Sequence, residues 1–452
     1  MSRTFIETPR LEHVYRPIAE RSQDYCEVEI QLSEDEVRKL AGRCQNCGLP
    51  FCHAMGCPLQ NAIPDINRAV MRGNWRDAWQ YLAQTSPFPE FTSRVCPALC
   101  EASCCLEGEG FGATNVRQIE KMLVDMAFAN GWVSPPIPRS RNGRKAAIVG
   151  AGPAGLAAAF RLNAAGWSVD IFDRNERPGG LLRYGIPCFK LDKALIERRW
   201  RLAEEAGIAF HGSTEVGKDI SGSYLQKHFD VLVVANGTPI PRDLKVPGRE
   251  LDGIFQALEL LGGQNRRNAG EADSAALSCE GKNVLIIGGG DTGNDCGGTA
   301  IRQGAASAMS MDLMPRPPAE RSEHTPWPLW PYRLRGSSSV EEGLKRVWSL
   351  NTLRFIGENG HITGVETVPI KWEYDANGRP SKFDVSGPAH IIPCDIVVLA
   401  MGFIRRSRED VLASLGLSDN ENVLLAGDAA NGPSLVVRAI ADAIKCVDKI
   451  KG

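Results

Sequence analysis

Lys145-Ala-Ala-Ile-Val-Gly-Ala-Gly-Pro-Ala-Gly155 is the stretch of sequence that decides the fold. Its apolar start predicts a short strand and its glycines a tight turn. The residues that follow predict a helix to about Ala165, capped by Gly166. In such a turn the first glycine makes the bend, the second lets a pyrophosphate approach the backbone, and the third lets the helix pack on the strand. The diphosphate then rests on the helix N-terminus, where unpaired N–H groups favour negative charge.

A glycine fingerprint of this form is weak evidence for nucleotide binding on its own, and here the neighbouring sequence strengthens that evidence. A second expected strand, 168–173, ends in Asp173, 18 residues beyond Gly155, where an acid that binds a ribose belongs. A purely structural glycine turn is the alternative. We expect a dinucleotide-binding domain with the candidate contacts Gly150, Gly152, Pro153, Ala154, Gly155 and Asp173.

The pattern recurs 138 residues later as Asn283-Val-Leu-Ile-Ile-Gly-Gly-Gly-Asp-Thr-Gly293, with an expected helix to about Gln303. Two strand-turn-helix units predict two Rossmann-like domains. The candidate contacts of the second are Gly288, Gly290, Asp291, Thr292 and Gly293.

The choice of nucleotide at the second fingerprint stays open from the residues. Asp312 ends the following strand and favours the free 2'-hydroxyl of NADH. Arg316 and Arg321 come just after it and could instead hold the 2'-phosphate of NADPH. The alternative for these arginines is a solvated loop.

Two further apolar runs come late in the chain, 395–402 and 423–428. The second ends in Gly427-Asp428, and an acid there can accept hydrogen bonds from a flavin's ribityl chain, while a helix over 434–446 points its N-terminus at the cofactor. Asp428 could also be a simple helix cap. We expect the first Rossmann-like domain to resume after the second.

Seven cysteines in the first quarter of the chain form two tight clusters. Their short spacings let one loop supply several thiolates to a [4Fe-4S] cluster at little cost in closure entropy. A proline follows Cys57 and Cys96, as in the ligating runs of bacterial ferredoxins. The clusters are Cys44-x2-Cys47-x4-Cys52-x4-Cys57 and Cys96-x3-Cys100-x3-Cys104.

Structural zinc and a disulfide framework are the alternatives for these cysteines. Zinc favours paired C-x2-C units, and only Cys44 and Cys47 make one. Disulfide scaffolds are short secreted chains, whereas this one has 452 residues and no secretory signal. The fold class we expect is α/β: a helical iron-sulfur domain over 1–143, an FAD-binding domain over 144–277 and 395–452, and an NAD(P)H-binding domain over 278–394.

Charge and hydropathy exclude two classes of partner. The net charge is −2 and the pI about 6.4, which does not suit a nucleic-acid binder. The longest uncharged apolar run, 146–160, contains glycines and a proline and is shorter than the ~18 residues of a membrane span. We expect no nucleic acid, no membrane and a cytoplasmic location.

Over nearly its whole length the chain resembles the small (beta) subunit of bacterial NADPH-dependent glutamate synthase. Similar modules occur in dihydropyrimidine dehydrogenase and in an electron-bifurcating NADH-dependent ferredoxin:NADP oxidoreductase. The two fingerprint and flavin motifs carry part of the match. The other segments are 43–53 (RCQNCGLPFCH), 91–100 (FTSRVCPALC), 177–187 (RPGGLLRYGIP), 314–318 (MPRPP) and 327–331 (WPLWP).

The resemblance implies an interleaved set of cluster ligands. Cys44, Cys47, Cys52 and Cys104 would hold one [4Fe-4S] cluster, and Cys57, Cys96 and Cys100 the other. A glutamine or glutamate completes the second set in the relatives, and the matching position here is Glu120, with Cys105 as the substitute. His53, beside a ligand, is expected to support the site and not to bind iron. The match also places Gly180, Leu181 and Arg316 among the nucleotide contacts.

The resemblance further implies that NADPH reduces FAD and that the clusters relay electrons to a large (alpha) subunit, where glutamate forms from glutamine and 2-oxoglutarate. Residue 2 is serine, so the N-terminal cysteine nucleophile for glutamine hydrolysis is missing, and no segment has (βα)8 length. The alternatives are an NAD(P)H oxidoreductase that feeds another acceptor, such as a ferredoxin-linked bifurcating complex, and a scaffold in which clusters and flavin are idle.

Overall fold

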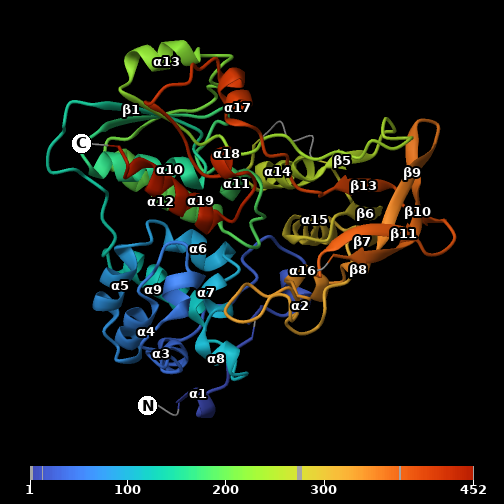
Figure 1. Cartoon of the computed structure of the whole chain (residues 1–452), viewed down its shortest axis with the longest axis horizontal. Helices are drawn as coiled ribbons and strands as arrows, with labels where there is room; N and C mark the ends of the chain where they lie inside the picture. Colours follow the sequence, from blue (N-terminus) through green and yellow to red (C-terminus); the bar gives the residue numbers. More distant parts are fainter. Residues whose placement is uncertain (1–3, 13, 272–276, 376–377, 451–452) are drawn as a thin grey trace.

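The computed structural model describes residues 4–12, 14–271, 277–375 and 378–450. Figure 1 shows a helical N-terminal part in blue. One parallel sheet and its helices lie above this part, and a second parallel sheet lies beside both. The expected fold class, a helical iron-sulfur domain followed by two Rossmann-like domains, is confirmed.

The N-terminal part is helical because its apolar residues recur at helical spacing around α9, whose inner face is fully buried. Its core forms where α3, α4 and α5 pack on α9. The helices are α1 (Thr4–Glu7), α2 (Ile18–Arg21), α3 (Glu34–Ala41), η1 (Cys52–Gly56), α4 (Ile63–Met71), α5 (Trp75–Ala83), α6 (Pro89–Val95), α7 (Leu99–Ala102), α8 (Cys105–Gly108) and α9 (Val116–Ala129).

The first parallel sheet has the strand order β14-β4-β1-β2-β3. Its central strands are buried on both faces, which explains their continuous apolar sequences. The strands are β1 (Lys145–Val149), β2 (Ser168–Phe172), β3 (Ala209–His211), β4 (Val231–Val234) and β14 (Val423–Leu425). The helices are α10 (Pro153–Ala164), α11 (Leu181–Tyr184), α12 (Lys193–Glu205), α13 (Gly222–His228), α17 (Arg408–Leu415), α18 (Asp428–Asn431) and α19 (Val436–Val447).

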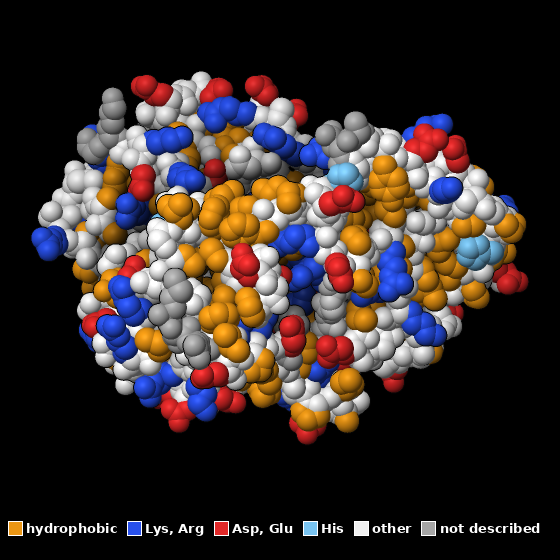
Figure 2. Space-filling view, turned by 60° about the horizontal axis from the view of Figure 1, so that its bottom comes forward, with side chains coloured by type: hydrophobic (Ala, Val, Ile, Leu, Met, Phe, Trp, Pro, Cys, Tyr) orange, Lys and Arg blue, Asp and Glu red, His pale blue; other side chains and the backbone are white. Residues whose placement is uncertain are grey.

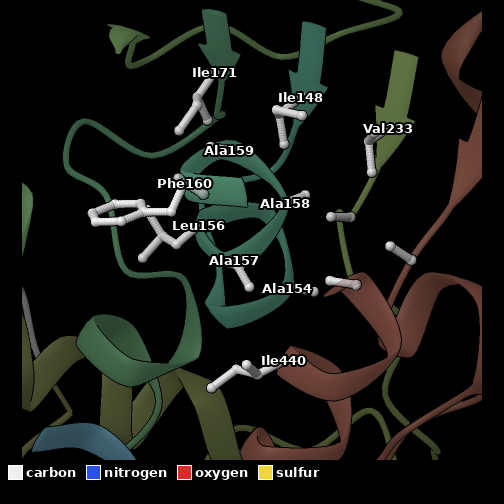
Figure 3. Close-up of a cluster of buried hydrophobic side chains, with 14 of the residues drawn as sticks. Ile148, Ala154, Leu156, Ala157, Ala158, Ala159, Phe160, Ile171, Val233 and Ile440 are labelled. Carbon is white, nitrogen blue, oxygen red and sulfur yellow. The ribbon is translucent and has the colours of Figure 1, made fainter. Parts of the chain in front are cut away.

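Small side chains let α10 and α19 approach closely beneath this sheet. Figure 3 shows the alanines of α10 beside Ile440 of α19, with Ile148, Ile171 and Val233 descending from the strands. Because alanine needs little room, residues far apart in sequence form one dense core. This packing places the fingerprint turn at the end of β1 next to the segment that precedes α19.

The second parallel sheet has the order β5-β13-β6-β7-β8. Helices α14 and α15 cover one face, and an antiparallel sheet of β9 to β12 packs on the other. The elements are β5 (Ile254–Gln256), α14 (Ala257–Asn268), β6 (Asn283–Ile287), α15 (Asp291–Arg302), β7 (Ser307–Asp312), α16 (Ser338–Glu341), β8 (Lys345–Trp348), β9 (Leu350–Glu358), β10 (His361–Tyr374), β11 (Pro380–Val385), β12 (His390–Pro393) and β13 (Ile396–Leu399).

Sheet membership corrects the boundaries expected at 277/278 and 394/395. β5 precedes the first of these and β13 follows the second, yet β13 pairs with both β5 and β6. The chain passes into the second domain near Pro241, earlier than expected, and returns to the first near Phe403, later than expected. These two residues form an antiparallel bridge. The second domain therefore includes 254–271 and 395–399 as well as the expected residues.

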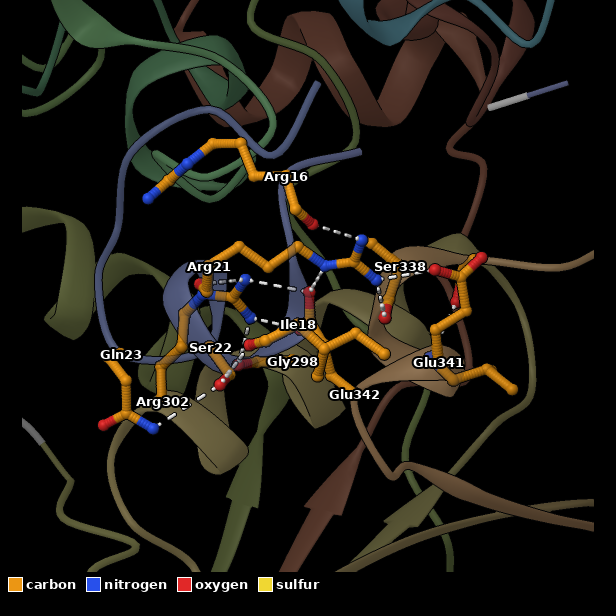
Figure 4. A network of polar contacts seen from close by, with 12 residues as sticks. Arg16, Ile18, Arg21, Ser22, Gln23, Gly298, Arg302, Ser338, Glu341 and Glu342 are labelled. Carbon is orange, nitrogen blue, oxygen red and sulfur yellow. Dashed lines mark hydrogen bonds and ion pairs between the residues drawn. The ribbon is translucent and has the colours of Figure 1, made fainter. Parts of the chain in front are cut away.

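A buried ionic network joins the N-terminal part to the second nucleotide domain (Figure 4). The guanidinium of Arg302 on α15 pairs with the Glu342 carboxylate at 2.6 Å, and both side chains are fully buried. Arg21 on α2 pairs with Glu342 at 2.8 Å and with Glu341 at 2.6 Å. The Arg302 guanidinium also lies 3.9 Å from the ring centroid of Phe189, in the first nucleotide domain. Buried charges require such pairing, so this network fixes how the three parts meet.

Among the described residues, no helix combines the length and the apolar character needed to cross a bilayer.

Candidate cofactor sites

The seven cysteines of the two clusters line two separate hollows in the N-terminal part. Cys44, Cys47, Cys52 and Cys104 line the first hollow, together with Cys105. Cys57, Cys96 and Cys100 line the second, together with Glu120. The structure thus divides these residues as the sequence resemblance implied, and it places Cys105 at the first hollow and not at the second.

A short π-helix, η1, separates the two hollows. The N–H of Cys57 donates to the carbonyl oxygen of Cys52 at 2.9 Å, which closes one wide turn. Cys52 faces the first hollow and Cys57 the second. The four-residue gap between them is therefore the length that lets one turn serve both sites.

Gly56 makes the contact between η1 and α7 possible. A Cβ atom at this position would lie 2.6 Å from the Cα of Cys100 and 3.1 Å from its nitrogen. Those atoms belong to backbone, so they cannot move aside cheaply. The absence of a side chain at Gly56 is what lets the two ligand loops meet.

Glu120 is buried on α9 and points into the second hollow. Its Oε1 accepts a hydrogen bond from Nδ2 of Asn61 at 2.9 Å, and Thr85 donates to Oδ1 of Asn61 at 2.8 Å, which fixes the amide. Burial raises the pKa of Glu120 to about 7, and the hydrogen bond from Asn61 opposes that rise. Among the described residues no ion pair to this carboxyl is found, and its oxygen atoms are of a kind that can ligate iron.

Backbone N–H groups point at most of the cysteine sulfur atoms. Burial raises the pKa of Cys57 to about 12 and of Cys96 to about 11, and hydrogen bonds from nearby backbone N–H groups oppose both rises. Such bonds stabilise thiolates and set the potentials of bound clusters. The donors are Asn46 for Cys44, His53 for Cys52, Leu59 and Asn61 for Cys57, Ala98 and Leu99 for Cys96, and Leu106, Glu107 and Thr114 for Cys104.

The His53 ring does not face either hollow as a ligand. Its Nδ1 lies 3.0 Å from the carbonyl oxygen of Asn61, so the side chain supports the loop that carries Glu120's partner. This agrees with the supporting role expected for it.

The thiols surround the two hollows and do not converge on a point. Across the described residues, no three or more His, Cys, Asp or Glu side chains come together as they would around a single ion. All 14 cysteines are free of disulfide bonds.

The first fingerprint forms the expected turn between β1 and α10. Gly150 has φ +102°, and a Cβ there would lie 2.6 Å from the Ala235 oxygen. A Cβ on Gly155 would overlap the Gly150 oxygen, whereas Gly152 has open space except for Gly180 at 4.0 Å. The open side of Gly152, at the N-terminus of α10, is where a pyrophosphate would fit.

Two other predicted segments lie against this turn. A Cβ on Gly180, before Leu181, would lie 2.7 Å from the Gly152 Cα, and one on Gly427 would lie 2.6 Å from the Ala154 Cβ. The Asp428 Oδ1 accepts a hydrogen bond from Ser434 at 2.6 Å, and burial raises the pKa of Asp428. The structure therefore gathers the residues predicted to hold FAD around one turn.

Asp173 and Asp312 play matching parts in the two fingerprints. Asp173 Oδ2 accepts from the Ala151 N–H at 2.6 Å, and Asp312 Oδ2 accepts from the Gly289 N–H at 3.1 Å. Each carboxylate thus holds its own glycine turn and has further lone pairs, which a ribose hydroxyl would need as acceptors. In the second turn Gly288 has φ +126°, and no atom lies within 4 Å of the Cβ position of Gly290, at the N-terminus of α15. Asp291 and Thr292 open that helix, and Gly293 packs on Gly288.

The two candidate arginines separate in the structure. Arg316 is exposed and lies 5.3 Å from the ring centroid of Trp348. Arg321 donates instead to three backbone carbonyls, those of Thr325, Leu329 and Ala102, so its role is to hold a loop. Arg346 lies near Arg316 instead: it is 5.4 Å from the same Trp348 ring, and burial, followed by the charge of Arg316, lowers its pKa.

Sequence reasoning missed Arg346 because it lies 30 residues beyond Arg316, on β8. The pairing of β7 with β8, Asp312 opposite Trp348, brings it back to the end of β7. It also missed Asn61, which orients Glu120. The sequence places Asn61 in the loop after Cys57, which hints at a role near that site. No local pattern indicates that it contacts α9.

Comparison with known proteins agrees with this division of the chain. Residues 21–132 match the family model described as dihydropyrimidine dehydrogenase domain II, 4Fe-4S cluster, and residues 144–327 match pyridine nucleotide-disulphide oxidoreductase. The structure of Mycobacterium tuberculosis FprA in complex with NADPH superposes with a TM-score of 0.54 at 17% identity, over 68% of this chain and 84% of that one. This last likeness shows the fold.

Two curated relatives align along nearly the whole chain. A glutamate synthase [NADPH] small chain of Mycobacterium tuberculosis is 43% identical, over 94% of this chain and 90% of the relative. A glutamate synthase [NADH] of Schizosaccharomyces pombe is 39% identical over 99% of this chain, which covers 22% of that longer protein.

The fold and the paired sites define an iron-sulfur flavin oxidoreductase that uses a pyridine nucleotide. Identity at this level over this length places the chain in a specific group within that class. The chain belongs to the family of glutamate synthase [NADPH] small chains.

Proposed function

We propose that this chain oxidises NADPH and delivers the electrons to a glutamate synthase large subunit, which forms glutamate from glutamine and 2-oxoglutarate. When bound, FAD accepts hydride from NADPH and the [4Fe-4S] clusters carry the two electrons onward one at a time, with release of NADP⁺ and a proton. The chain's own residues position these groups and set their surroundings. The observation that carries the proposal is the division of the cysteines between two hollows beside a flavin-type fingerprint.

The geometry supports the following residues as those that would hold each group. Cys44, Cys47, Cys52 and Cys104 would ligate one cluster, and Cys57, Cys96, Cys100 and Glu120 the other. The first glycine turn with Gly180, Leu181, Gly427 and Asp428 would hold FAD, and the second turn with Asp291 and Thr292 would hold NADPH.

The two cluster sites differ in their distance from the first nucleotide domain. Val437, at the start of α19, lines the second hollow, and Cys57 and Cys96 pack against the core of that domain. Only residues of the N-terminal part line the first hollow. We propose that electrons enter the second site and leave from the first.

The surface beside the first hollow supports the proposal that electrons leave the chain there. Leu49, in the loop before η1, and Met55, on η1, expose 78% and 57% of their surface. Figure 2, which brings the lower side of Figure 1 forward, shows hydrophobic side chains in patches between charged ones. A large subunit that docks here would come close to the first cluster and cover these side chains.

We propose that Arg316 and Arg346 together bind the 2'-phosphate of NADPH. Both guanidinium groups flank Trp348 at the end of β7, beside Asp312. Arg346→Ala should raise the Michaelis constant for NADPH and leave that for NADH nearly unchanged, whereas Arg321→Ala should not discriminate between them. Equal losses with both nucleotides in Arg346→Ala would reject this assignment.

The proposed function is tested with anaerobically purified chain. We expect about eight irons and one FAD per chain, bleaching of the flavin by NADPH, and glutamate formation only when a large subunit of a family member is added. Zinc in place of iron, or a flavin that NADPH does not bleach, would reject the proposal. Normal bleaching with no glutamate and with reduction of a ferredoxin would assign the chain to another acceptor.

A further inference from the structure

The loop over 313–335 leaves the second nucleotide domain after β7 and contacts the N-terminal part beside the first hollow. Three of its hydrogen bonds reach three consecutive residues there. Nη2 of Arg321 donates to the Ala102 oxygen at 3.1 Å, Oγ of Ser103 donates to the Pro328 oxygen at 2.9 Å, and Nε1 of Trp327 donates to the Cys104 oxygen at 3.0 Å. The loop is therefore fastened to the segment that carries a cluster cysteine.

Trp327 also makes the apolar part of this contact. Its ring covers Gly108, where a Cβ would lie only 3.0 to 3.1 Å from the indole carbons. The ring centroid is 4.8 Å from that of Phe51, and Phe51 lines the first hollow. In Figure 1 the orange loop passes beside α7 and α8, the elements on either side of Cys104.

The loop holds its shape through its own hydrogen bonds. The Leu334 N–H donates to the Pro318 oxygen at 2.7 Å, and the Ser322 N–H donates to the Tyr332 oxygen at 3.2 Å, so its two arms run side by side. Arg333 adds an ion pair with Glu107 of α8 at 3.1 Å. A loop closed in this way can hold Trp327 in one place against another domain.

We propose that Trp327 is a positioning residue for the first iron-sulfur cluster, supplied by the nucleotide-binding domain. Its ring supports Phe51 against the hollow and keeps water from that side, and its N–H fixes the peptide of the ligand Cys104. Burial and the surrounding hydrogen bonds set the stability and the potential of a cluster. The first site is thus complete only when the nucleotide domain is docked. This inference rests on the proposed assignment of a cluster to Cys44, Cys47, Cys52 and Cys104.

The second site offers the contrast that makes the inference specific. Neither hollow is lined by a residue of the 313–335 loop, but Trp327 contacts Cys104 and Phe51, which line the first hollow. None of the loop contacts described above reaches a residue that lines the second hollow, which Val437 of the first nucleotide domain lines instead. Removing Trp327 should therefore affect one cluster and leave the other as it was.

The experiment uses the full chain with both clusters and compares Trp327→Ala, Trp327→Phe and Leu329→Ala. Leu329 lies in the same loop with 48% of its surface exposed, so its variant controls for changes in the loop itself. Iron content is followed during exposure to air, and the paramagnetic signals of the two clusters are titrated for their potentials. A Cys44→Ser chain identifies the signal of the first cluster. FAD content and NADPH bleaching are measured in parallel.

We expect Trp327→Ala to lose the iron of the first cluster about ten-fold faster than the parent, with the second cluster, FAD and bleaching unchanged. Trp327→Phe should keep the iron but shift the potential of the first cluster, since it keeps a ring and loses the N–H donor. Leu329→Ala should match the parent. Iron retention and potentials in both Trp327 variants equal to those of Leu329→Ala would overturn the inference. If Trp327→Ala does not fold, an unshifted potential in Trp327→Phe overturns it. A parent chain without iron would instead contradict the proposed function.

Discussion

The two cysteine sites are built from the same short loops but differ in their fourth ligand position and in their neighbours. The first has four cysteines, with Cys105 beside them, and lies beside exposed apolar residues of the N-terminal part. The second has three cysteines and Glu120, and it lies against the first nucleotide domain. The difference teaches that two cysteine motifs can form one site against a neighbouring domain and another nearer the surface. A single wide turn, η1, separates the two sites.

The largest effects are expected from removing one cysteine of each site. Cys96→Ser should remove the second cluster, and Cys44→Ser the first, because each thiolate is one of four ligands. With Cys96→Ser, NADPH should still bleach the flavin, but neither cluster should be reduced. With Cys44→Ser, the second cluster should still be reduced while delivery to the partner stops. Anaerobic spectra after NADPH addition test this order, and reduction of the first cluster in Cys96→Ser would reverse it.

The next largest effect is expected from replacing Glu120, because only the second site has a carboxylate among its candidate ligands. Glu120→Ala should open one iron and make the second cluster labile or convert it toward a three-iron form, with the first cluster intact. Glu120→Gln should retain the cluster, since its amide oxygen can still bind iron. Iron analysis and paramagnetic spectra measure the outcome. Full iron and an unchanged spectrum in Glu120→Ala would make Glu120 an ordinary buried carboxyl.

The same carboxyl predicts a pH dependence of the iron-free chain. Its pKa rises from 4.5 to about 7 on folding, so the folded state binds the proton more tightly than the unfolded state. The free energy of unfolding should fall as the pH rises from about 4.5 to 7, with a penalty of about 3 kcal/mol fully present above pH 7. Denaturant titrations of iron-free chain at several pH values measure it. Glu120→Gln should lose this slope, and an equal slope in both chains would contradict the assignment.

Gly56→Ala should damage both sites at once, since Gly56 lies where their loops touch. The added methyl would meet the Cys100 backbone at 2.6 Å, and overpacking of this kind costs about 1–3 kcal/mol. Gly48→Ala is the control, because no atom lies within 4 Å of its Cβ position. The midpoint temperature of thermal unfolding and the iron content should both fall in Gly56→Ala and stay unchanged in Gly48→Ala.

The smallest effect concerns a backbone difference between the sites. Asn46 in the first and Ala98 in the second both have left-handed backbone, with φ +49° and +62°. Asparagine tolerates this conformation, whereas alanine is strained by about 1 kcal/mol. Ala98→Gly should therefore stabilise the chain slightly or leave it unchanged, and Asn46→Gly should not stabilise it. A loss of stability in Ala98→Gly greater than in Asn46→Gly would show that the strain is not there.

Local patterns predicted the parts of this molecule whose partners are close in sequence. The two glycine turns and the ends of α10 and α15 follow from strand, glycine and helix signals within about 20 residues. The division of the cysteines followed from the family resemblance, and the residues alone did not give it.

Pairing between distant strands was not predictable in the same way. β5 and β13 are short apolar runs whose sequences suit either sheet, and only their neighbours decide which one they join. The antiparallel sheet of β9 to β12 was not foreseen either, because its alternating pattern is broken by register shifts in β10. Arg346 and Trp327 gained their roles only through contacts with segments far from them in sequence.

The ionic network of Arg21, Arg302 and Glu342 has a consequence for synthesis on the ribosome. Arg21 emerges early, yet its partner Glu342 follows 321 residues later. Until then its guanidinium has no buried carboxylate to pair with, so α2 cannot settle into its final place. The N-terminal part can assemble its helices first, but the three parts can lock together only after most of the chain has been translated.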